Sequence, residues 1–267
     1  MKEILLGKPT VYVNTYHPDL LHPIPRSLGR DIIGLKDPLP FHGVDLWTGF
    51  ELSWLNAKGK PEIALADFTF PCNSPFLVES KSFKLYLNSY NQSKFSSWEE
   101  VRQTLIKDLT SAAQTAVQVV LFSHSHPFPI SSFEGICLDD LDIEIDTYSV
   151  NPSFLTTLPD TADQTFYTHL LKSNCMATGQ PDWGSLSMRV IGPKIEPIGL
   201  FRYLISYRNH IGFGEHCLEK IYFDLYNRCK PEKLTVYARY TRRGGLDINP
   251  FRSSFENPPN NYRLSRQ

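Results

Sequence analysis

The sequence has only five cysteines in 267 residues, and no two of them form a Cys-x-x-Cys pair. Disulfide frameworks and zinc knuckles depend on paired cysteines, so both classes are excluded. No stretch approaches the ~20 apolar residues that a membrane-spanning helix needs. Residues 1–9 hold an apolar run that is too short for the core of a secretory signal peptide. These absences predict a cytoplasmic protein with free thiols.

Neither sign of charge is in excess. Lysine and arginine number 27 against 28 aspartates and glutamates, which gives a formal net charge of −1. Binding to nucleic acid or to an anionic membrane requires a basic surface, so neither partner is expected. With 41% hydrophobic and 21% charged residues, the composition is that of a soluble globular protein. The length fits one large domain or two domains of ordinary size.

Nucleotide-binding and metal-binding signatures are also missing. There is no phosphate-binding G-x-x-x-x-G-K-[ST] motif, and Gly212-Phe213-Gly214 has Cys217 where a dinucleotide fingerprint needs its third glycine. A Rossmann fold is therefore excluded. His124 and His126 have no third ligand at a characteristic spacing, so their segment is interpreted as a polar loop and no metal is expected.

Hydrophobic periodicity predicts two sets of strands and helices after an irregular arm of about 40 residues. Ser97, followed three residues later by Glu100, has the spacing of a capping box at a helix start. The segment Lys58-Gly59-Lys60-Pro61 predicts the turn of a β-hairpin. The expected strands cover 46–54, 63–70, 117–122, 141–146, 186–190 and 234–240, and the expected helices cover 79–90, 97–109, 199–207 and 215–225.

The two halves of the chain match one another. The separation between matched residues falls only from 118 to 116 along the chain, which predicts a tandem duplication of a strand-strand-helix-helix-strand unit. Turn signals place the boundary in the loop 148–158. The matched pairs are Phe83 with Phe201, Ser89 with Ser206, Glu99 with Glu215, Asp108 with Asp224, and Val120 with Val236.

Three segments carry candidate chemistry, and the residues alone leave each of them open. Cys175 lies in a loop that runs into a strand, where it is either a partly exposed reactive thiol or an inert buried one. Asp182, seven residues further along the chain, is either held near the thiol in the folded protein or is a solvated charge. The charged helix start 79–86 is either a site or a solvated amphipathic face. Arginines at 239, 242 and 243 before Gly244 and Gly245 can hold phosphate or form a basic turn.

Together these segments resemble the NADPH-dependent 7-cyano-7-deazaguanine reductases, the nitrile reductases of queuosine biosynthesis in tRNA. The run Glu79-Ser80-Lys81-Ser82-Phe83-Lys84-Leu85-Tyr86 fits the signature of that family at every position, and the segments 175–184 and 239–250 look like the family's too. The resemblance covers nearly the whole chain. It implies an α+β tandem tunnelling fold (T-fold), with two repeats of antiparallel sheet carrying helices on one face, in modules 1–150 and 151–267.

The resemblance also implies a mechanism. Cys175 would add its sulfur to the nitrile carbon and form a covalent thioimide, and thiolates are the best protein nucleophiles near neutral pH. Asp182 would give a proton to the nitrile nitrogen, which requires a protonated carboxyl and hence burial or a nearby negative charge. Two NADPH would then reduce the thioimide and the following imine to the aminomethyl product.

The binding residues follow from the same resemblance. It implies a homodimer with 7-cyano-7-deazaguanine as its small-molecule substrate and NADPH as its cofactor. The two glutamates would pair with the deazaguanine edge, because a carboxylate offers two acceptors to adjacent N–H donors. The implied substrate residues are Val78, Glu79, Ser80, Gly214 and Glu215, and the implied NADPH residues are Ser80, Lys81, Arg243 and Gly244.

One position departs from the family. The family has Phe-His-Glu where this chain has Phe213-Gly214-Glu215, so an imidazole is missing beside Glu215. His216 would point elsewhere on a helix, since successive residues are ~100° apart. We therefore expect lower turnover than in relatives with the histidine, and a gain on Gly214→His. Two other functions stay open: a cyclohydrolase-like pterin or purine hydrolase of the same fold, and a non-catalytic deazapurine-binding protein.

Overall fold

A computed structural model describes residues 12–267, and the predicted absence of a signal segment at 1–9 falls outside them. The fold is α+β, with a sheet rich in antiparallel pairs and several helices. The chain divides into two compact units. The first holds 12–28, Asp45–Phe128 and Arg242–Ile248, and the second holds Gly29–Val44, Pro129–Thr241 and Asn249–Gln267.

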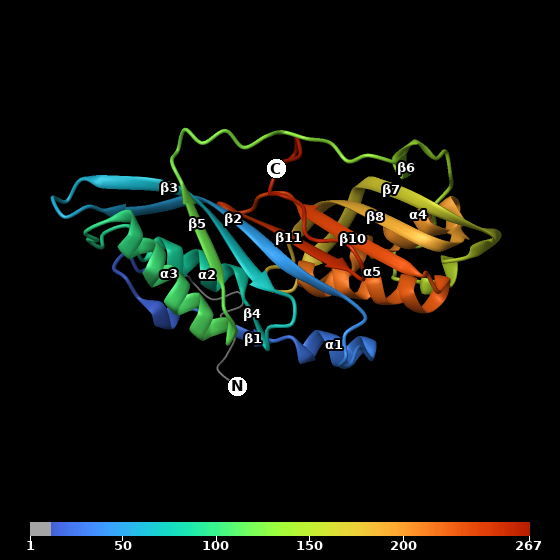
Figure 1. The fold of residues 1–267 in the computed structure, drawn as a ribbon, viewed down its shortest axis with the longest axis horizontal. Helices are drawn as coiled ribbons and strands as arrows, with labels where there is room; N and C mark the ends of the chain where they lie inside the picture. The colour runs from blue at the N-terminus through green and yellow to red at the C-terminus, as the bar shows by residue number, and fades with distance from the viewer. Residues whose placement is uncertain (1–11) are drawn as a thin grey trace. The chain divides into compact units, whose positions relative to one another are not determined.

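Three strands in the order β5-β3-β2 form the sheet of the first unit, and helices α2 and α3 cover one of its faces (Figure 1). Aromatic side chains dominate the core between them: Phe83 on α2 lies edge-to-face on Phe68 of β3, with ring centroids 4.9 Å apart. The elements in this part of the chain are η1 (Pro18–Leu20), β1 (Pro23–Pro25), α1 (Ser27–Ile33), β2 (His42–Leu55), β3 (Pro61–Pro71), β4 (Phe76–Val78), α2 (Ser80–Asn88), α3 (Trp98–Ala113) and β5 (Gln118–Phe122).

The turn between β2 and β3 shows why the sequence reverses there. The backbone N–H of Asn56 donates to the carbonyl of Lys60 over 2.9 Å, and Gly59 takes φ +83°. Glycine adopts that left-handed conformation without steric cost. The predicted hairpin is confirmed, as are the helices of this half and the strand at 117–122.

In the second unit the strand order is β11-β10-β8-β7-β6, and the short β9 pairs with β7 in parallel. Helices α4 and α5 contact these strands, and buried leucines and tyrosines line both helices. The elements are β6 (Ile136–Cys137), η2 (Leu138–Asp140), η3 (Pro152–Phe154), β7 (Thr157–Cys175), β8 (Pro181–Ile195), α4 (Pro197–Ile205), η4 (Ser206–Asn209), β9 (Ile211–Gly212), α5 (Gly214–Cys229), β10 (Lys233–Tyr240) and β11 (Leu246–Ser253).

The same buried tyrosine–tyrosine–aspartate cluster occurs in both units. In the first, the hydroxyls of Tyr86 and Tyr90 lie 2.6 Å apart, and Tyr86 donates to Asp108 over 2.7 Å. The second cluster, described next, repeats this pattern at matching positions of α4, η4 and α5. Such a buried network fixes how the two helices of a unit pack together.

In the second cluster the hydroxyls of Tyr203 and Tyr207 lie 2.9 Å apart, and Tyr203 donates to Asp224 over 2.7 Å. The tyrosines are 117 residues from their counterparts and the aspartate 116. That spacing aligns Phe83 with Leu200, so the sequence pairing of Phe83 with Phe201 was one residue out of register. The helices α3 and α5 both span 16 residues and both end in a left-handed C-cap.

One predicted strand was wrong, and one long strand was missed. Residues 141–146 form no strand, although the apolar residues at 141, 143 and 145 are half-buried and the acidic ones between them are exposed. The 19-residue strand β7, which the sequence did not predict, pairs instead with β8 and carries Cys175 at its end. The expected irregular arm is also more regular than predicted, because it contains β1 and α1.

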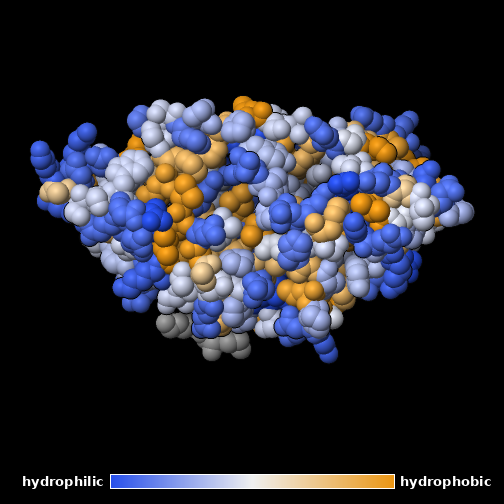
Figure 2. Space-filling model, in the orientation of Figure 1, coloured by the Kyte–Doolittle hydropathy of each residue, from blue (hydrophilic) through white to orange (hydrophobic). Residues whose placement is uncertain are grey.

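Hydrophobic side chains gather on the surface over β5, the outer strand of the first unit's sheet (Figure 2). Val120 on this strand is 48% exposed. An outer strand presents backbone groups that have no partner within its own sheet, so this edge is able to associate with another chain.

Candidate functional site

Cys175 is held at the end of a hairpin rather than in a loop. It is the last residue of β7, and its backbone N–H donates to the carbonyl of Gln180 over 2.8 Å across the turn to β8. Its carbonyl accepts from Gly179, which has φ +69°. On the other side Cys175 is in register with Gly212 of β9. The backbone around the thiol is therefore fixed from both sides, and the side chain is buried.

Asp182 lies on the same face of this hairpin. It is paired directly with Ser173 across the antiparallel strands. Ser173 and Cys175 are two residues apart on β7, so their side chains point to one face of the strand. The thiol and the carboxyl predicted to act together are thus brought to one face of the hairpin end.

Glu215 and Gly214 begin helix α5, and Glu215 is buried. A second thiol, Cys217, lies in the same turn and is fully buried. Burial, with a smaller effect from the negative charges of Asp182 and Glu215, raises the pKa of Cys217 to about 12. Both carboxylates therefore act on one buried thiol, which stays protonated at neutral pH.

Tyr240, the last residue of β10, completes this group. Burial raises the pKa of its hydroxyl well above the ordinary value, and charge on Cys217, Asp182 and Glu215 adds to the effect. Ser173 lies beside this group, and its hydroxyl lowers the pKa of both Tyr240 and Cys217 through side-chain hydrogen bonding, against the larger effect of burial.

Gly214 leaves space for Tyr240. A β-carbon at position 214 would lie 2.9 Å from Cε2 of Tyr240, which is closer than real β-carbons come. The neighbouring His216 points away, as predicted: its ring lies edge-on to Phe213, and a β-carbon on Gly29 would collide with it. The part of the site where the family has histidine is therefore bordered by a tyrosine.

In the first unit, Glu79 is the N-cap of α2. Its two carboxylate oxygens accept from the backbone N–H groups of Lys81 and Ser82 over 2.9 and 2.7 Å. Val78 ends β4 just before it and is buried, whereas Ser80 and Lys81 are half-buried in the first helical turn. Glu79 thus has a structural role that its motif alone did not predict.

Glu196 caps α4 in the same way. Its carboxylate accepts from the N–H groups of Ile198 and Gly199 over 2.9 and 2.6 Å. Glu79 and Glu196 are 117 residues apart, like the paired tyrosines. A capping glutamate is therefore part of the repeated scaffold, and only its first copy belongs to the signature run.

Arg243 and Gly244 lie in a turn of the first unit. The backbone N–H of Arg243 donates to Leu246 over 2.9 Å, and Gly244 and Gly245 follow with φ +63° and +79°. Gly244 is exposed and Arg243 is half-buried. The predicted residues are thus divided between the units: Val78, Glu79, Ser80, Lys81, Arg243 and Gly244 belong to the first, and Cys175, Asp182, Gly214 and Glu215 to the second.

The hairpin that carries Cys175 has a counterpart in the first unit. Each turn spans five residues, begins its second strand with proline and contains a glycine with positive φ. Every counterpart is 120 residues earlier, and leucine stands where the second unit has the thiol. The pairs are Ser53 with Ser173, Leu55 with Cys175, Gly59 with Gly179, Pro61 with Pro181, and Glu62 with Asp182.

Comparison with known proteins identifies the family. The family model described as "Nitrile reductase, 7-cyano-7-deazaguanine-reductase N-term" matches residues 12–121, and the one described as "QueF-like protein" matches residues 181–259. This chain belongs to the 7-cyano-7-deazaguanine nitrile reductase family. Cys175 lies between the two matched ranges.

Curated relatives in the family extend the similarity across the whole chain. The protein named "NADPH-dependent 7-cyano-7-deazaguanine reductase" from Burkholderia multivorans is 52% identical over 98% of this chain and 97% of its own length. The protein of the same name from Burkholderia thailandensis has the same identity and coverage. That from Azoarcus sp. is 52% identical over 93% of this chain and 90% of its own length.

Sequence reasoning about the family missed Cys217 and Tyr240. Cys217 follows Glu215 by two residues, and Tyr240 lies in the segment 239–250 that resembles the family, but the sequence assigned neither of them a role. Only the folded chain brings them to the carboxylates. Among the described residues, no group of three or more histidine, cysteine, aspartate or glutamate side chains could hold a metal ion, and no helix is long and apolar enough to cross a membrane.

Proposed function

We propose that this protein reduces the nitrile of 7-cyano-7-deazaguanine to the aminomethyl group of 7-aminomethyl-7-deazaguanine, with NADPH as reductant, in queuosine biosynthesis. Relatives named for this reductase match the chain over nearly its whole length. The observation that carries the proposal is the placement of Cys175 and Asp182 on one face of the β7–β8 hairpin end.

The first step is addition of Cys175 to the nitrile. The sulfur forms a bond to the nitrile carbon, one π bond of the nitrile breaks, and its electron pair goes to the nitrogen, which takes up a proton. The product is a thioimide on Cys175. The fixed backbone of the hairpin end supports this role, because a nucleophile that is already positioned loses little entropy when it reacts.

Asp182 is the proposed donor of that proton. Asp182 is half-buried, and its charge, like that of the buried Glu215, raises the pKa of Cys217. A nearby negative charge favours the protonated form of a carboxyl, which is the form that an acid requires. This neighbourhood supports Asp182 as an acid.

Reduction follows in two stages. When bound, NADPH supplies hydride, once to the thioimide carbon and once to the imine carbon. Between the two transfers the carbon–sulfur bond breaks and Cys175 leaves as thiolate. With two protons the balance is four electrons per nitrile, which takes it to the amine.

The remaining assignments are proposals about individual residues. Val78, Glu79, Ser80, Gly214 and Glu215 would contact the substrate, and Ser80, Lys81, Arg243 and Gly244 would contact NADPH. The first-unit residues suit that cofactor, because Lys81 and Arg243 are cations and Gly244 brings bare backbone to the surface of its turn. Each oxygen of Glu79 also keeps a lone pair after capping α2.

We further propose two modules of the tunnelling fold, residues 1–150 and 151–267, in a cytoplasmic homodimer. The repeated caps, tyrosine clusters and hairpins support the modules. The exposed outer strand β5 offers an edge for pairing between chains. Sedimentation of the purified protein, alone and with Val120→Lys on that edge, tests the dimer: a monomeric wild type would defeat it.

NADPH absorbance with purified protein and 7-cyano-7-deazaguanine tests the reaction. The expected result is two NADPH oxidised per substrate, none with Cys175→Ala, and normal turnover with Cys137→Ala, which removes a half-buried thiol elsewhere in the same unit. Mass spectrometry should find a substrate adduct on Cys175 when NADPH is withheld. Absence of both oxidation and adduct in the wild type would defeat the proposal.

A further inference from the structure

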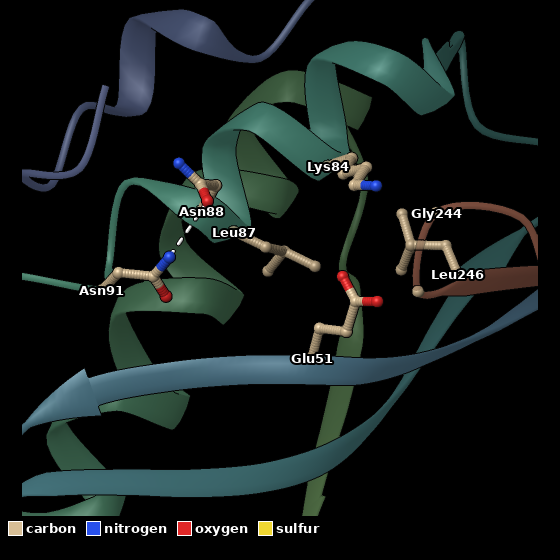
Figure 3. Close-up of a pocket in the computed structure, with 8 residues that line it drawn as sticks. Glu51, Lys84, Leu87, Asn88, Asn91, Gly244 and Leu246 are labelled. Atoms are coloured by element: carbon tan, nitrogen blue, oxygen red, sulfur yellow. Dashed lines mark hydrogen bonds between the residues drawn. The ribbon is translucent and has the colours of Figure 1, made fainter. Parts of the chain in front are cut away.

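The pocket drawn in Figure 3 lies in the first unit and has a volume of about 140 Å³. Gly244 is among its lining residues, so the pocket belongs to the cofactor region already proposed. The second unit holds a different feature, which the proposed mechanism does not use. Gln267, the last residue of the sequence, is buried there and bonded to Tyr240, the tyrosine that borders Gly214.

The side-chain amide of Gln267 uses its full hydrogen-bonding capacity. Its Nε2 donates to the backbone carbonyl of Tyr240 over 3.0 Å and to Oδ1 of Asn249 over 2.8 Å. Its Oε1 accepts from Nε of Arg239 over 2.5 Å and from the backbone N–H of Leu264 over 3.1 Å. A primary amide has two N–H donors and two lone pairs, so all four are occupied. An ionised glutamate has the same shape but offers acceptors only.

These contacts connect β10 to β11 beyond the end of their backbone ladder. The ladder ends where Tyr237 pairs with Phe251. Pro250, the residue before Phe251 on β11, has no N–H to donate. Past this point the Gln267 amide bonds to both strands through its two N–H groups. The link between the strands at this end therefore runs through a side chain.

The segment that carries Gln267 is itself anchored. The backbone N–H of Gln267 donates to the carbonyl of Leu264 over 3.0 Å, and Nη2 of Arg263 donates to the backbone carbonyl of Gln267. The side chain of Leu264 is buried in a hydrophobic cluster with Tyr237 and Phe251. The amide is thus directed at the end of β10 by the fold of its own segment.

The ring of Tyr240 has little space in which to move. A β-carbon on Gly184 would lie 3.2 Å from both Cδ1 and Cε1 of the ring, and one on Gly214 would lie 2.9 Å from Cε2. The ring therefore lies against two glycines, one on β8 and one at the start of α5. Gly184 is paired directly with Tyr240 and shares a strand face with Asp182, two residues before it. A shift of the Tyr240 backbone would press its ring against the elements that carry Asp182 and Glu215.

We infer that Gln267 is a positioning residue for the reaction at Cys175. It holds the end of β10 so that the ring of Tyr240 stays between its two glycines. This rests on the proposed function, which makes Cys175 the nucleophile. Gln267 contacts no reacting atom itself and acts through Tyr240 on the shape of the site. Misplacement of site groups by about 1 Å costs on the order of 100-fold in rate, so loss of this contact should be visible in the chemistry.

Gln267→Glu tests this role, because it keeps the shape of the side chain and the contact with Arg239 but removes both N–H donors. Gln164→Glu is the matched control. Gln164 is also buried in the second unit, and its amide accepts from the N–H of Ile195 over 2.7 Å and donates to the carbonyl of the same residue over 3.4 Å. Both variants should lose stability in urea denaturation. Only Gln267→Glu should slow formation of the substrate adduct on Cys175, by about 10- to 100-fold, as measured by mass spectrometry without NADPH.

A Tyr240→Leu background separates positioning from a general loss of order. If Gln267 acts through the tyrosine ring, Gln267→Glu should slow the adduct little further once the ring is gone, because the effects of coupled residues do not add. Gln267→Met, which is uncharged and of similar length, replaces Gln267→Glu if the carboxylate prevents folding, and it should slow the adduct likewise.

Three results would overturn the inference: a wild-type adduct rate in the Gln267 variant, an equal loss of rate in the Gln164 control, or the same fold-loss with and without the Tyr240 ring. A wild type that forms no adduct and oxidises no NADPH would instead defeat the proposed function, so the two failures are distinguishable.

Discussion

A β-carbon on Gly214 would lie 2.9 Å from Cε2 of Tyr240. The buried Tyr240 at the end of β10 can therefore keep its position only because residue 214, at the start of α5, has no side chain. The family resemblance predicts a histidine at position 214, and in this chain the space beside that position is occupied by Tyr240.

Gly214→Ala should destabilise the protein by about 1–3 kcal/mol, because the added methyl group forces the Tyr240 ring to move. In an open helix start the same change would stabilise instead. Urea denaturation measures the effect, and Tyr240→Leu in the same chain should remove most of the alanine penalty. Gly214→His should carry a similar cost in stability, and the rate gain expected from the family comparison is measured separately by turnover.

Glu79→Gln and Glu196→Gln form a matched pair, because both glutamates cap a helix through two backbone N–H groups. Each change should cost about 1 kcal/mol of unfolding free energy through the weakened cap. Only Glu79→Gln should also weaken binding of 7-cyano-7-deazaguanine. Calorimetry in a Cys175→Ala background measures that binding, and equal affinity in the two variants would limit Glu79 to capping.

Tyr86→Phe and Tyr203→Phe remove equivalent hydroxyls from the two buried clusters. Each leaves its aspartate with one other contact: Tyr16 at Asp108, and Lys220 at Asp224. Hydrogen bonds to charged groups contribute about 1.5–3 kcal/mol, so both variants should lose similar stability by urea denaturation. A large loss in one variant with none in the other would contradict equal roles in the two units.

Stability should fall at high pH in a way that depends on Cys217. Its pKa is raised to about 12, so the folded chain keeps a proton that the unfolded chain releases from about pH 9 upward. The contribution is complete below pH 9 and is lost as the pH rises toward 12, on the order of a few kcal/mol in total. Cys217→Ala should flatten this part of the profile in denaturation experiments across that range. If stability fell with pH as steeply in Cys217→Ala as in the wild type, the raised pKa of Cys217 would be refuted.

The sequence predicted most helices and strands because their apolar residues recur at regular intervals. The prediction failed where apolar and polar residues alternate but no neighbouring strand pairs with the segment. Residues 141–146 alternate between half-buried and exposed side chains like a strand, but in the described chain their backbone joins no sheet. Conversely, the first part of β7 is polar and exposed, so its pairing with β8 leaves no hydrophobic pattern to detect.

The site residues were also predicted only in part. Motif resemblance selected Cys175 and Asp182, and strand register explains how residues seven positions apart reach one face. Cys217 and Tyr240 were beyond prediction, because their environment arises from packing between α5 and the strands. The capping role of Glu79 was accessible in principle, since a glutamate before a helix start is able to accept from its first N–H groups.

The duplicated hairpin bears on how such a protein gains its chemistry. The turn closes equally well with Leu55 or with Cys175 before it, because its shape depends on glycine and backbone hydrogen bonds rather than on the reacting side chain. A nucleophile can therefore be acquired or discarded at this position by a single amino-acid change, without rebuilding the scaffold.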